Sequence, residues 1–572
     1  MVYVKTTVRR RGNKEYTYLS LVEAERRGGK VVHNTLLRLG EASELRDSGQ
    51  LDRIIAALRA HAEGTWLSGS EMAGEDAPTV GAVAGVDAIF GRLGLDSHFA
   101  AVGAKRRAEH LADTVEVLAA NRLIAPGSKR RTILEWLDTV SLPAGLATPS
   151  LEQCYRALDA LADAKEATEA HLYRVLTDLT NLDLRLVCYD LTSTYFETSQ
   201  GPSAKFPSRA FGYSRDHRGD RPQVMIGLLV TGDGIPIAHE VFAGNTADVS
   251  TLAGRLTDLQ ARFGVGKIAV VADRGLISEA NLDAVQAAGF DHVLATRLHR
   301  DHDVASVLEA AQAEGLAWVA VDQAGTTAAE VTHDGRRYVV VSSPSRKVRD
   351  DIRREQLIVR TEDRLVALAE RVSAGRLKDP AKIAVAADRI LKDSGVGRCF
   401  TTQVRAGSFS WDFDADVLRY EEFLLAGRYV ITTSLAADDA STAAVVAYYK
   451  SLQNVERRFR VLKDFLALRP VYHWTEKRVR GHIALCVLAA VIEAVVAKSL
   501  AQADVRDPDI EAQHLSPRRA IAELGRIRQA TITAGEQRIT VVTRRSALQA
   551  AILAVLGVDT HSWDKATITR AS

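Results

Sequence analysis

Three acidic residues occupy positions from which they could bind metal ions. Asp190 ends the apolar run 184–190, Asp273 ends the run 267–273, and Glu456 lies in a long predicted helix. A carboxylate at the end of a buried strand is costly without a compensating cation, and oxygen ligands suit Mg²⁺, for which Mn²⁺ can substitute. Two strand acids and one helix acid could hold a pair of ions that act on a phosphodiester. Each aspartate alone is equally explained by a helix cap or a surface turn.

The predicted helix around Glu456 carries further polar side chains. Tyr449, Glu456 and Lys463 are spaced by seven residues. That spacing is close to two helical turns, so the three should share a face. Arg460 joins this face because it follows Glu456 by four residues. The face could bind phosphates beside a metal-bound bond, although a surface helix with ordinary Glu/Arg pairs gives the same spacing.

These residues resemble a family signature. Tyr449, Glu456 and Lys463 match the Tyr-Arg-Glu-Lys pattern of bacterial insertion-sequence DDE transposases of the insertion-sequence-four superfamily, with Leu452 at the arginine position. Four further segments look like recurring motifs of that family: Tyr189–Glu197, Ala272–Leu276, Ser214–Arg218 and Phe242–Asp248.

The resemblance implies a DNA transposase that acts as a homodimer. It would bind the terminal inverted repeats and target DNA, and would cut and join strands with Mg²⁺ held by Asp190, Asp273 and Glu456. Tyr449, Arg460 and Lys463 would contact DNA. Two other functions remain open: a ribonuclease-H-like nuclease without strand transfer, and a catalytically silent DNA-binding derivative.

Tyr429 lies in a predicted strand before the glutamate helix. Hairpin-forming members of the family place a tryptophan at this point, where it stacks on a flipped base. An aromatic ring at position 429 could stack in the same way. A tyrosine packed in the core explains the position as well.

Basic residues gather in two segments although the whole chain has a net charge of only +2. Residues 1–40 hold nine Lys/Arg against three Glu, and residues 448–480 hold nine against three acidic residues. One such cluster is usually a solvated face, but two favour a polyanion as partner. We expect further DNA contacts from two arginine-rich sites: Arg9, Arg10 and Arg11, and Lys129, Arg130 and Arg131.

The fold class expected from these patterns and from the resemblance is α/β, with a ribonuclease-H-like catalytic core interrupted by a β-rich insertion domain. N-terminal β and helical DNA-binding regions precede the core. A helix-turn-helix and generic helical packing explain the helical region equally well. The expected regions are 1–65 (basic β region with a helix), 66–180 (helical DNA-binding region), 181–300 and 436–500 (the two parts of the core), 301–435 (the insertion) and 501–572 (dimerisation or DNA contact).

The remaining features exclude other classes of protein. The four cysteines form no Cys-x-x-Cys pair, which excludes a disulfide framework and a structural zinc site. The longest apolar run, Ile483–Ile492, is too short to span a membrane and predicts a buried helix. No secretory signal and no dinucleotide-binding motif is found. We therefore expect a cytoplasmic, nucleoid-associated protein without a membrane or small-molecule cofactor.

Overall fold

The computed structural model divides into two compact units. The first comprises 1–76, 530–541 and 566–572, and the second comprises 77–529 and 542–565. The structure describes residues 2–12, 14–27, 30–61, 72–180, 186–246, 257, 261, 269–273, 283, 285–287, 289–296, 302–312, 316–405, 407–534 and 537–570.

The first unit is built from small antiparallel sheets. One sheet has the strand order β1-β2-β3, with helices α1 and α2 following it in the chain; the other has the order β20-β19-β18-β4 and joins residues from both ends of the sequence. The strands of the basic N-terminal segment were predicted, but they are longer than the patterns indicated. The bounds are β1 (Val2–Arg11), β2 (Lys14–Arg27), β3 (Lys30–Glu41), α1 (Ala42–Asp47), α2 (Gln50–Ala60), β4 (Met72–Gly74), β18 (Gln529–Ala534), β19 (Gln537–Val542) and β20 (Thr567–Arg570).

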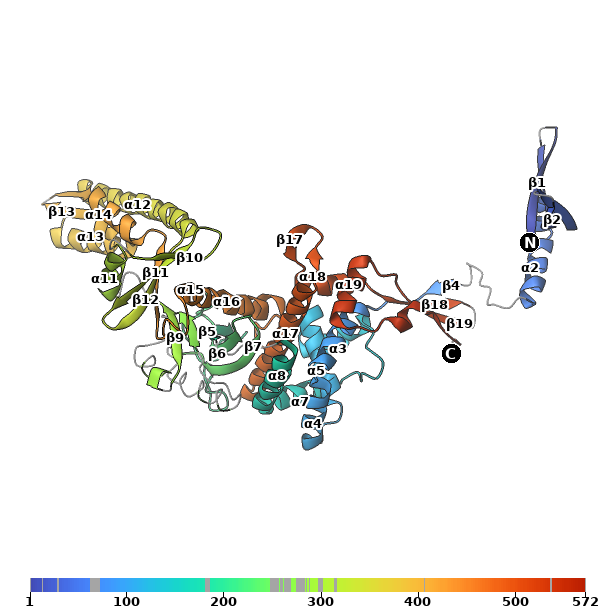
Figure 1. The fold of residues 1–572 in the computed structure, drawn as a ribbon, viewed down its shortest axis with the longest axis horizontal. Coiled ribbons are helices and arrows are strands. Elements are labelled where there is room, and N and C mark those ends of the chain that lie inside the picture. Colours follow the sequence, from blue (N-terminus) through green and yellow to red (C-terminus); the bar gives the residue numbers. More distant parts are fainter. Residues whose placement is uncertain are drawn as a thin grey trace. The chain divides into compact units, whose positions relative to one another are not determined.

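A nine-stranded mixed sheet organises the second unit, in the order β10-β11-β12-β15-β9-β8-β5-β6-β7 (Figure 1). Strands β5, β8 and β9 run parallel, whereas β6 and β7 form a hairpin antiparallel to β5. The parallel strands are short and strongly apolar because they are buried on both faces. The bounds are β5 (Leu186–Tyr195), β6 (Gln223–Thr231), β7 (Pro236–Ala243), β8 (Ala269–Asp273), β9 (Asp291–Ala295), β10 (Trp318–Ala320), β11 (Thr327–His333), β12 (Arg336–Ser342) and β15 (Arg428–Thr433).

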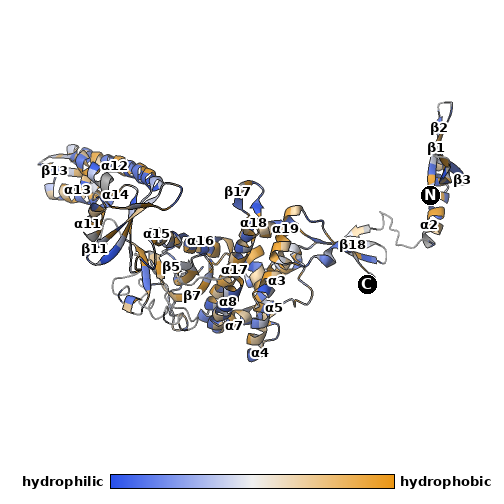
Figure 2. Ribbon diagram, in the orientation of Figure 1, coloured by the Kyte–Doolittle hydropathy of each residue, from blue (hydrophilic) through white to orange (hydrophobic). Residues whose placement is uncertain are grey.

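Helices pack against this sheet around one long apolar helix, α17 (Glu476–Gln502). It contacts β7, α5 and α7, and Figure 2 colours it largely as hydrophobic. By length and composition it could cross a membrane, but 83% of its most apolar window is buried within the protein. The prediction of a buried helix is therefore confirmed. The neighbouring elements are α3 (Gly81–Arg92), α4 (Leu95–Arg106), α5 (Leu111–Ile124), α6 (Lys129–Arg131), η2 (Thr132–Trp136), η3 (Leu137–Thr139), α7 (Leu151–Asp163), α8 (Lys165–Thr180), β16 (Arg506–Asp507), β17 (Ile510–His514), α18 (Pro517–Leu524), α19 (Ala547–Leu556) and η7 (His561–Asp564).

The segment 301–435 is not β-rich, contrary to the prediction. Helix α12 (Pro344–Ser373) alone spans 30 residues, and α13 (Pro380–Ser394) adds 15. These two helices share a small hydrophobic core with a two-stranded sheet, while β10, β11, β12 and β15 extend the large sheet instead. The other elements of the segment are α11 (His302–Ala310), η5 (Gly397–Cys399), β13 (Phe400–Arg405), β14 (Ser408–Phe413) and α14 (Ala415–Leu425).

The helix that carries Glu456 is interrupted, although the sequence pattern predicted one continuous helix over 442–468. It consists of α15 (Thr442–Lys450), α16 (Leu452–Arg460) and a π-helical turn, η6 (Val461–Phe465). A π-turn has more residues per turn than an α-helix, so it rotates the residues that follow relative to those before it. The shared face expected for residues seven apart is consequently not maintained through η6.

A buried ion pair joins α16 to α17. A guanidinium nitrogen of Arg458 contacts the Glu493 carboxylate, and both side chains are less than 10% exposed. Because removing one partner leaves an unpaired buried charge, we predict that Glu493→Gln lowers the free energy of unfolding by about 3–5 kcal/mol. Denaturant unfolding measures this loss. Arg457→Ala, at the exposed neighbouring position, should change it by less than about 0.5 kcal/mol; equal losses in the two variants would contradict the prediction.

Candidate functional site

Strand β5 places Asp190 within the large sheet, beside the strand that ends at Asp273. The parallel register pairs Cys188 of β5 with Val271 of β8. Asp190 and Asp273 each follow that pair by two residues, so the two backbones reach the same level of the sheet. The side chain of Asp273 lies outside the described residues.

Helix α16 brings Glu456 to the same region. The helix is fixed at its start, where the Ser451 hydroxyl lies 3.0 Å from the Cys188 sulfur, and along one side, where the Asn454 amide donates to the Gly232 carbonyl at 2.7 Å. The Arg458–Glu493 pair holds the opposite side. Glu456 itself is exposed, because it projects from the face that these contacts leave uncovered.

Asp190 and Glu456 line one polar cavity of about 610 Å³. The strand acid, the helix acid and the start of α12 meet there. The lining residues are Asp190, Arg215, Asp322, Ala324, Thr326, Ser343, Ser345, Arg346, Arg349, Tyr429, Tyr449, Lys450, Leu452, Gln453 and Glu456.

The carboxylate of Asp190 carries an incompletely compensated negative charge. Its side chain is only 16% exposed, and burial raises its pKa to about 6, with Glu456 adding to the increase. The Arg215 guanidinium, 3.4 Å away, and the Leu191 amide, which donates to Oδ1 at 2.7 Å, lower the pKa but do not cancel the effect of burial. A further cation beside Asp190 would therefore stabilise the ionised carboxylate.

The donor set fits a hard divalent cation. Asp190 and Glu456 offer carboxylate oxygens to one cavity, and the cation nearest Asp190 is a guanidinium at a long 3.4 Å. Among the described residues no group of three His, Cys, Asp or Glu side chains is placed to bind a metal ion. The sequence predicted the third ligand at Asp273, whose side chain is not described.

Two tyrosines form the aromatic part of the cavity. The rings of Tyr429 and Tyr449 lie 5.6 Å apart and tilted, and the Arg346 guanidinium lies 5.1 Å from the centre of the Tyr429 ring. Burial raises the pKa of Tyr429 to about 12, so this phenol stays neutral. Both residues that the sequence proposed for the groove thus line it together with Glu456.

Lys463 and Arg460 do not share this position. The Lys463 ammonium lies 2.7 Å from a carboxylate oxygen of Asp216 and is 11% exposed, which follows from the rotation introduced by the π-turn. Arg460 is exposed. Neither residue is among those that line the cavity in the described part of the chain.

Lys129 is misassigned as a DNA contact by the sequence argument. Ser128 caps the short helix that follows by accepting from the Arg131 amide, and this turns Lys129 inward, where it is 3% exposed and lies 3.4 Å from a ring nitrogen of His482. Burial lowers the pKa of its amine well below the usual value. Arg130 and Arg131 remain exposed, so they are still available to bind phosphate.

The three arginines of β1 are all exposed. Arg10 pairs with Glu15 at 2.5 Å, and the Arg9 guanidinium lies 5.8 Å from the centre of the Tyr18 ring. The positive face that the composition predicted for this unit is therefore accessible to a polyanion.

Sequence reasoning missed Arg215, Arg349 and the Lys450–Asp322 pair, whose atoms are 2.6 Å apart. Arg215 belongs to one of the segments that resemble family motifs, which was the only local signal. Its place beside Asp190 follows from the path of the chain between β5 and β6 and not from any spacing.

Comparison with known families gives two matches. The model of the N-terminal domain of IS1634 family transposases matches residues 4–70, and the model of the transposase DDE domain matches residues 182–492. The second match covers more than half of the chain. No curated protein matches the sequence.

The raised pKa of Asp190 predicts a pH-dependent gain in stability on its neutralisation. The folded-state pKa, about 6, exceeds the ordinary value of 3.8, so ionisation costs folding free energy that is absent below pH 4 and complete above pH 6. Asp190→Asn should therefore stabilise the metal-free protein at pH 8 by at most about 3 kcal/mol, and by much less at pH 4.5. Melting curves in EDTA measure both shifts. Asp464→Asn, at an exposed site, is the control, and equal shifts of Asp190→Asn at both pH values would refute the prediction.

Proposed function

We propose how this chain works from the premise that it belongs to the DDE transposases of insertion sequences, enzymes that cleave DNA and transfer the cut strand. The family match favours this function over a nuclease without strand transfer and over a silent DNA-binding derivative. The finer assignments that follow concern the acids, the metal, the DNA contacts and the assembly.

The observation that carries the proposal is the meeting of Asp190 and Glu456 in one polar cavity. They come from a strand and a helix that are far apart in the sequence, and Glu456 raises the pKa of Asp190, which requires the two charges to be near each other. The β5–β8 register supports adding Asp273 as the third acid. The mixed sheet, with β5 between the β6–β7 hairpin and the parallel β8, supports a ribonuclease-H-like core.

Asp190, Asp273 and Glu456 would hold Mg²⁺, or Mn²⁺ in its place. When bound, these ions supply the Lewis acidity that activates water or a 3′-hydroxyl and stabilises the leaving oxygen. The protein's own contribution is to keep the carboxylates ionised and directed at one point. The Leu191 amide and Arg215 do this for Asp190, while the anchoring of α16 does it for Glu456.

The DNA duplex would lie across the cavity, with its phosphates on the cationic side chains of the rim. Tyr449 and Tyr429 offer aromatic surface for a base or sugar beside the cut. Arg460 and Lys463 would contact phosphates further along the backbone. Binding of the terminal inverted repeats would involve the exposed arginines of β1, together with Arg130 and Arg131.

The assembly would be a homodimer, because joining two element ends requires two active sites. The enzyme would act on chromosomal and target DNA in the cytoplasm. No membrane or small-molecule cofactor enters this proposal.

Replacing a metal-holding acid should abolish catalysis without abolishing DNA binding. We predict that Asp190→Asn and Glu456→Gln reduce cleavage and strand transfer of labelled element ends by several orders of magnitude, because the acids place both the nucleophile and the leaving group. Asp464→Asn removes an exposed carboxylate from the same part of the chain and should behave like the unmodified protein. A normal rate of end joining by either acid variant would show that the assignment is wrong.

Removing the N-terminal unit's basic strands should weaken binding of element ends. Phosphate contacts make log K fall with log salt by about 0.9 per contact, so deletion of residues 1–65 should lower both the affinity and the salt slope. A chain with Arg9, Arg10 and Arg11 all changed to Gln is the matched control, because it retains the fold of the strands. Gel-shift titrations at several salt concentrations measure both quantities, and unchanged end binding after the deletion would exclude this segment from the interface.

A further inference from the structure

The glutamate helix lacks a cation at the position where its signature has an arginine. Leu452 occupies that position and lines the cavity with Tyr449 and Glu456. Two neighbouring cations could replace the arginine. Lys450, however, is paired with Asp322 at 2.6 Å, and Arg457 is exposed and is not among the described lining residues.

Arg215 places a guanidinium in the same cavity from a different part of the chain. It lies in the segment between β5 and β6, 3.4 Å from Oδ1 of Asp190, and it donates to the Leu191 carbonyl. Its side chain is 35% exposed, so part of the guanidinium faces the cavity while the rest is held by the strand. Of the four cations that line the cavity in the described part of the chain, this is the one that contacts Asp190.

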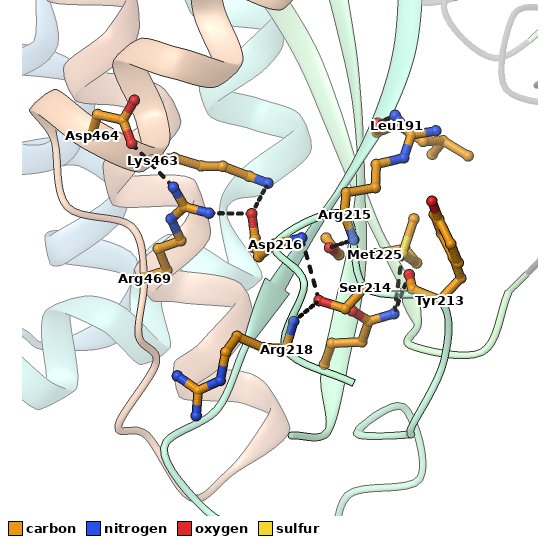
Figure 3. A network of polar contacts seen from close by, with 12 residues as sticks. Leu191, Tyr213, Ser214, Arg215, Asp216, Arg218, Met225, Lys463, Asp464 and Arg469 are labelled. Atoms are coloured by element: carbon orange, nitrogen blue, oxygen red, sulfur yellow. Dashed lines mark hydrogen bonds and ion pairs between the residues drawn. The ribbon is translucent and has the colours of Figure 1, made fainter. Parts of the chain in front are cut away.

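The backbone around Arg215 is fixed at several points, as Figure 3 shows. The Arg215 amide donates to the Ser193 hydroxyl of β5 at 3.2 Å, and the Ser214 hydroxyl accepts from the Asp216 and Arg218 amides at 3.3 and 3.1 Å. A residue held in this way loses little conformational entropy when it binds a ligand.

The next residue, Asp216, points the other way and engages the end of the glutamate helix. One of its oxygens accepts from Lys463 at 2.7 Å and also from Arg469 (Figure 3), and the side chain is 5% exposed. Lys463 is thereby neutralised by a buried carboxylate. The turn 214–216 therefore sets two cations apart: Arg215 in the cavity, and Lys463 outside its described lining.

We propose that Arg215 binds the phosphate beside the bond that is cut, and so supplies the cation that Leu452 does not. This inference rests on the proposed function and adds a substrate-binding residue to it. A guanidinium presents a planar pair of N–H groups that matches two phosphate oxygens. Its place next to Asp190 puts that phosphate beside the metal-holding acids.

The test combines substitutions at positions 215 and 452. The probe is a fluorescein-labelled duplex of the DNA that flanks the gene, and the readouts are the salt slope of binding and the single-turnover cleavage rate in Mn²⁺. Arg215→Gln should reduce the salt slope by about 0.9 and slow cleavage about 10- to 100-fold, as expected for a lost charged hydrogen bond. Adding Leu452→Arg to Arg215→Gln should restore part of both.

A matched control comes from the same loop. Arg218 pairs with Asp220 at 2.9 Å and is not among the described residues that line the cavity, so Arg218→Gln should leave the slope and the rate within twofold of the unmodified protein. Melting curves on every variant report folding. The salt slope of Arg215→Gln alone decides the phosphate contact, even where Leu452→Arg does not fold.

Three results would overturn the inference. They are an unchanged slope and rate in Arg215→Gln, a full rate recovered at saturating Mn²⁺, which would assign Arg215 to the metal site alone, and a folded double variant no faster than Arg215→Gln. Failure of the proposed function gives a different result, because the unmodified protein would then cut no flanking DNA.

Discussion

The burial of a negative charge on β5 is the constraint on which the site depends. Asp190 lies within the sheet, where desolvation favours its protonated form. The surrounding structure opposes that tendency with the Leu191 amide and the Arg215 guanidinium, but only in part. An acid that remains short of positive charge binds a cation more strongly than an acid already paired. The apolar strand that makes Asp190 costly to bury is thus also what makes it useful for DNA cleavage.

The second acid depends on helix anchoring. Glu456 is exposed, so its position is fixed by its neighbours and not by its own contacts. Asn454 on the β6–β7 turn and Arg458 on α17 hold α16 on two sides. The break at Ser451 and the π-turn after Arg460 let this short helix follow the sheet without extending the straight line of α15. The positions of Tyr449 and Lys463 diverge for the same reason.

The helices of segment 301–435 illustrate why the prediction of β-rich structure was wrong. Asp379 caps α13 by accepting from the Ala381 amide, and Pro380 occupies the first turn, a start signal that is legible in the sequence. Short β-branched runs received more weight than this signal. The strands that do occur there pair with β15 and so belong to the large sheet, which no local pattern could indicate because pairing partners are far apart in the chain.

The sequence by itself determined the class of enzyme, the acids Asp190, Asp273 and Glu456, the buried helix near 483–492 and the basic N-terminal strands. These follow from local residue types, from periodicity and from resemblance, all of which are encoded over short distances. Only the tertiary structure decided that Asp190 and Glu456 share a cavity, that Lys129 is buried, that Lys463 pairs with Asp216, and that Arg215 lies beside Asp190. Such contacts join segments distant in sequence, and their free energy depends on burial that arises only when the chain has folded.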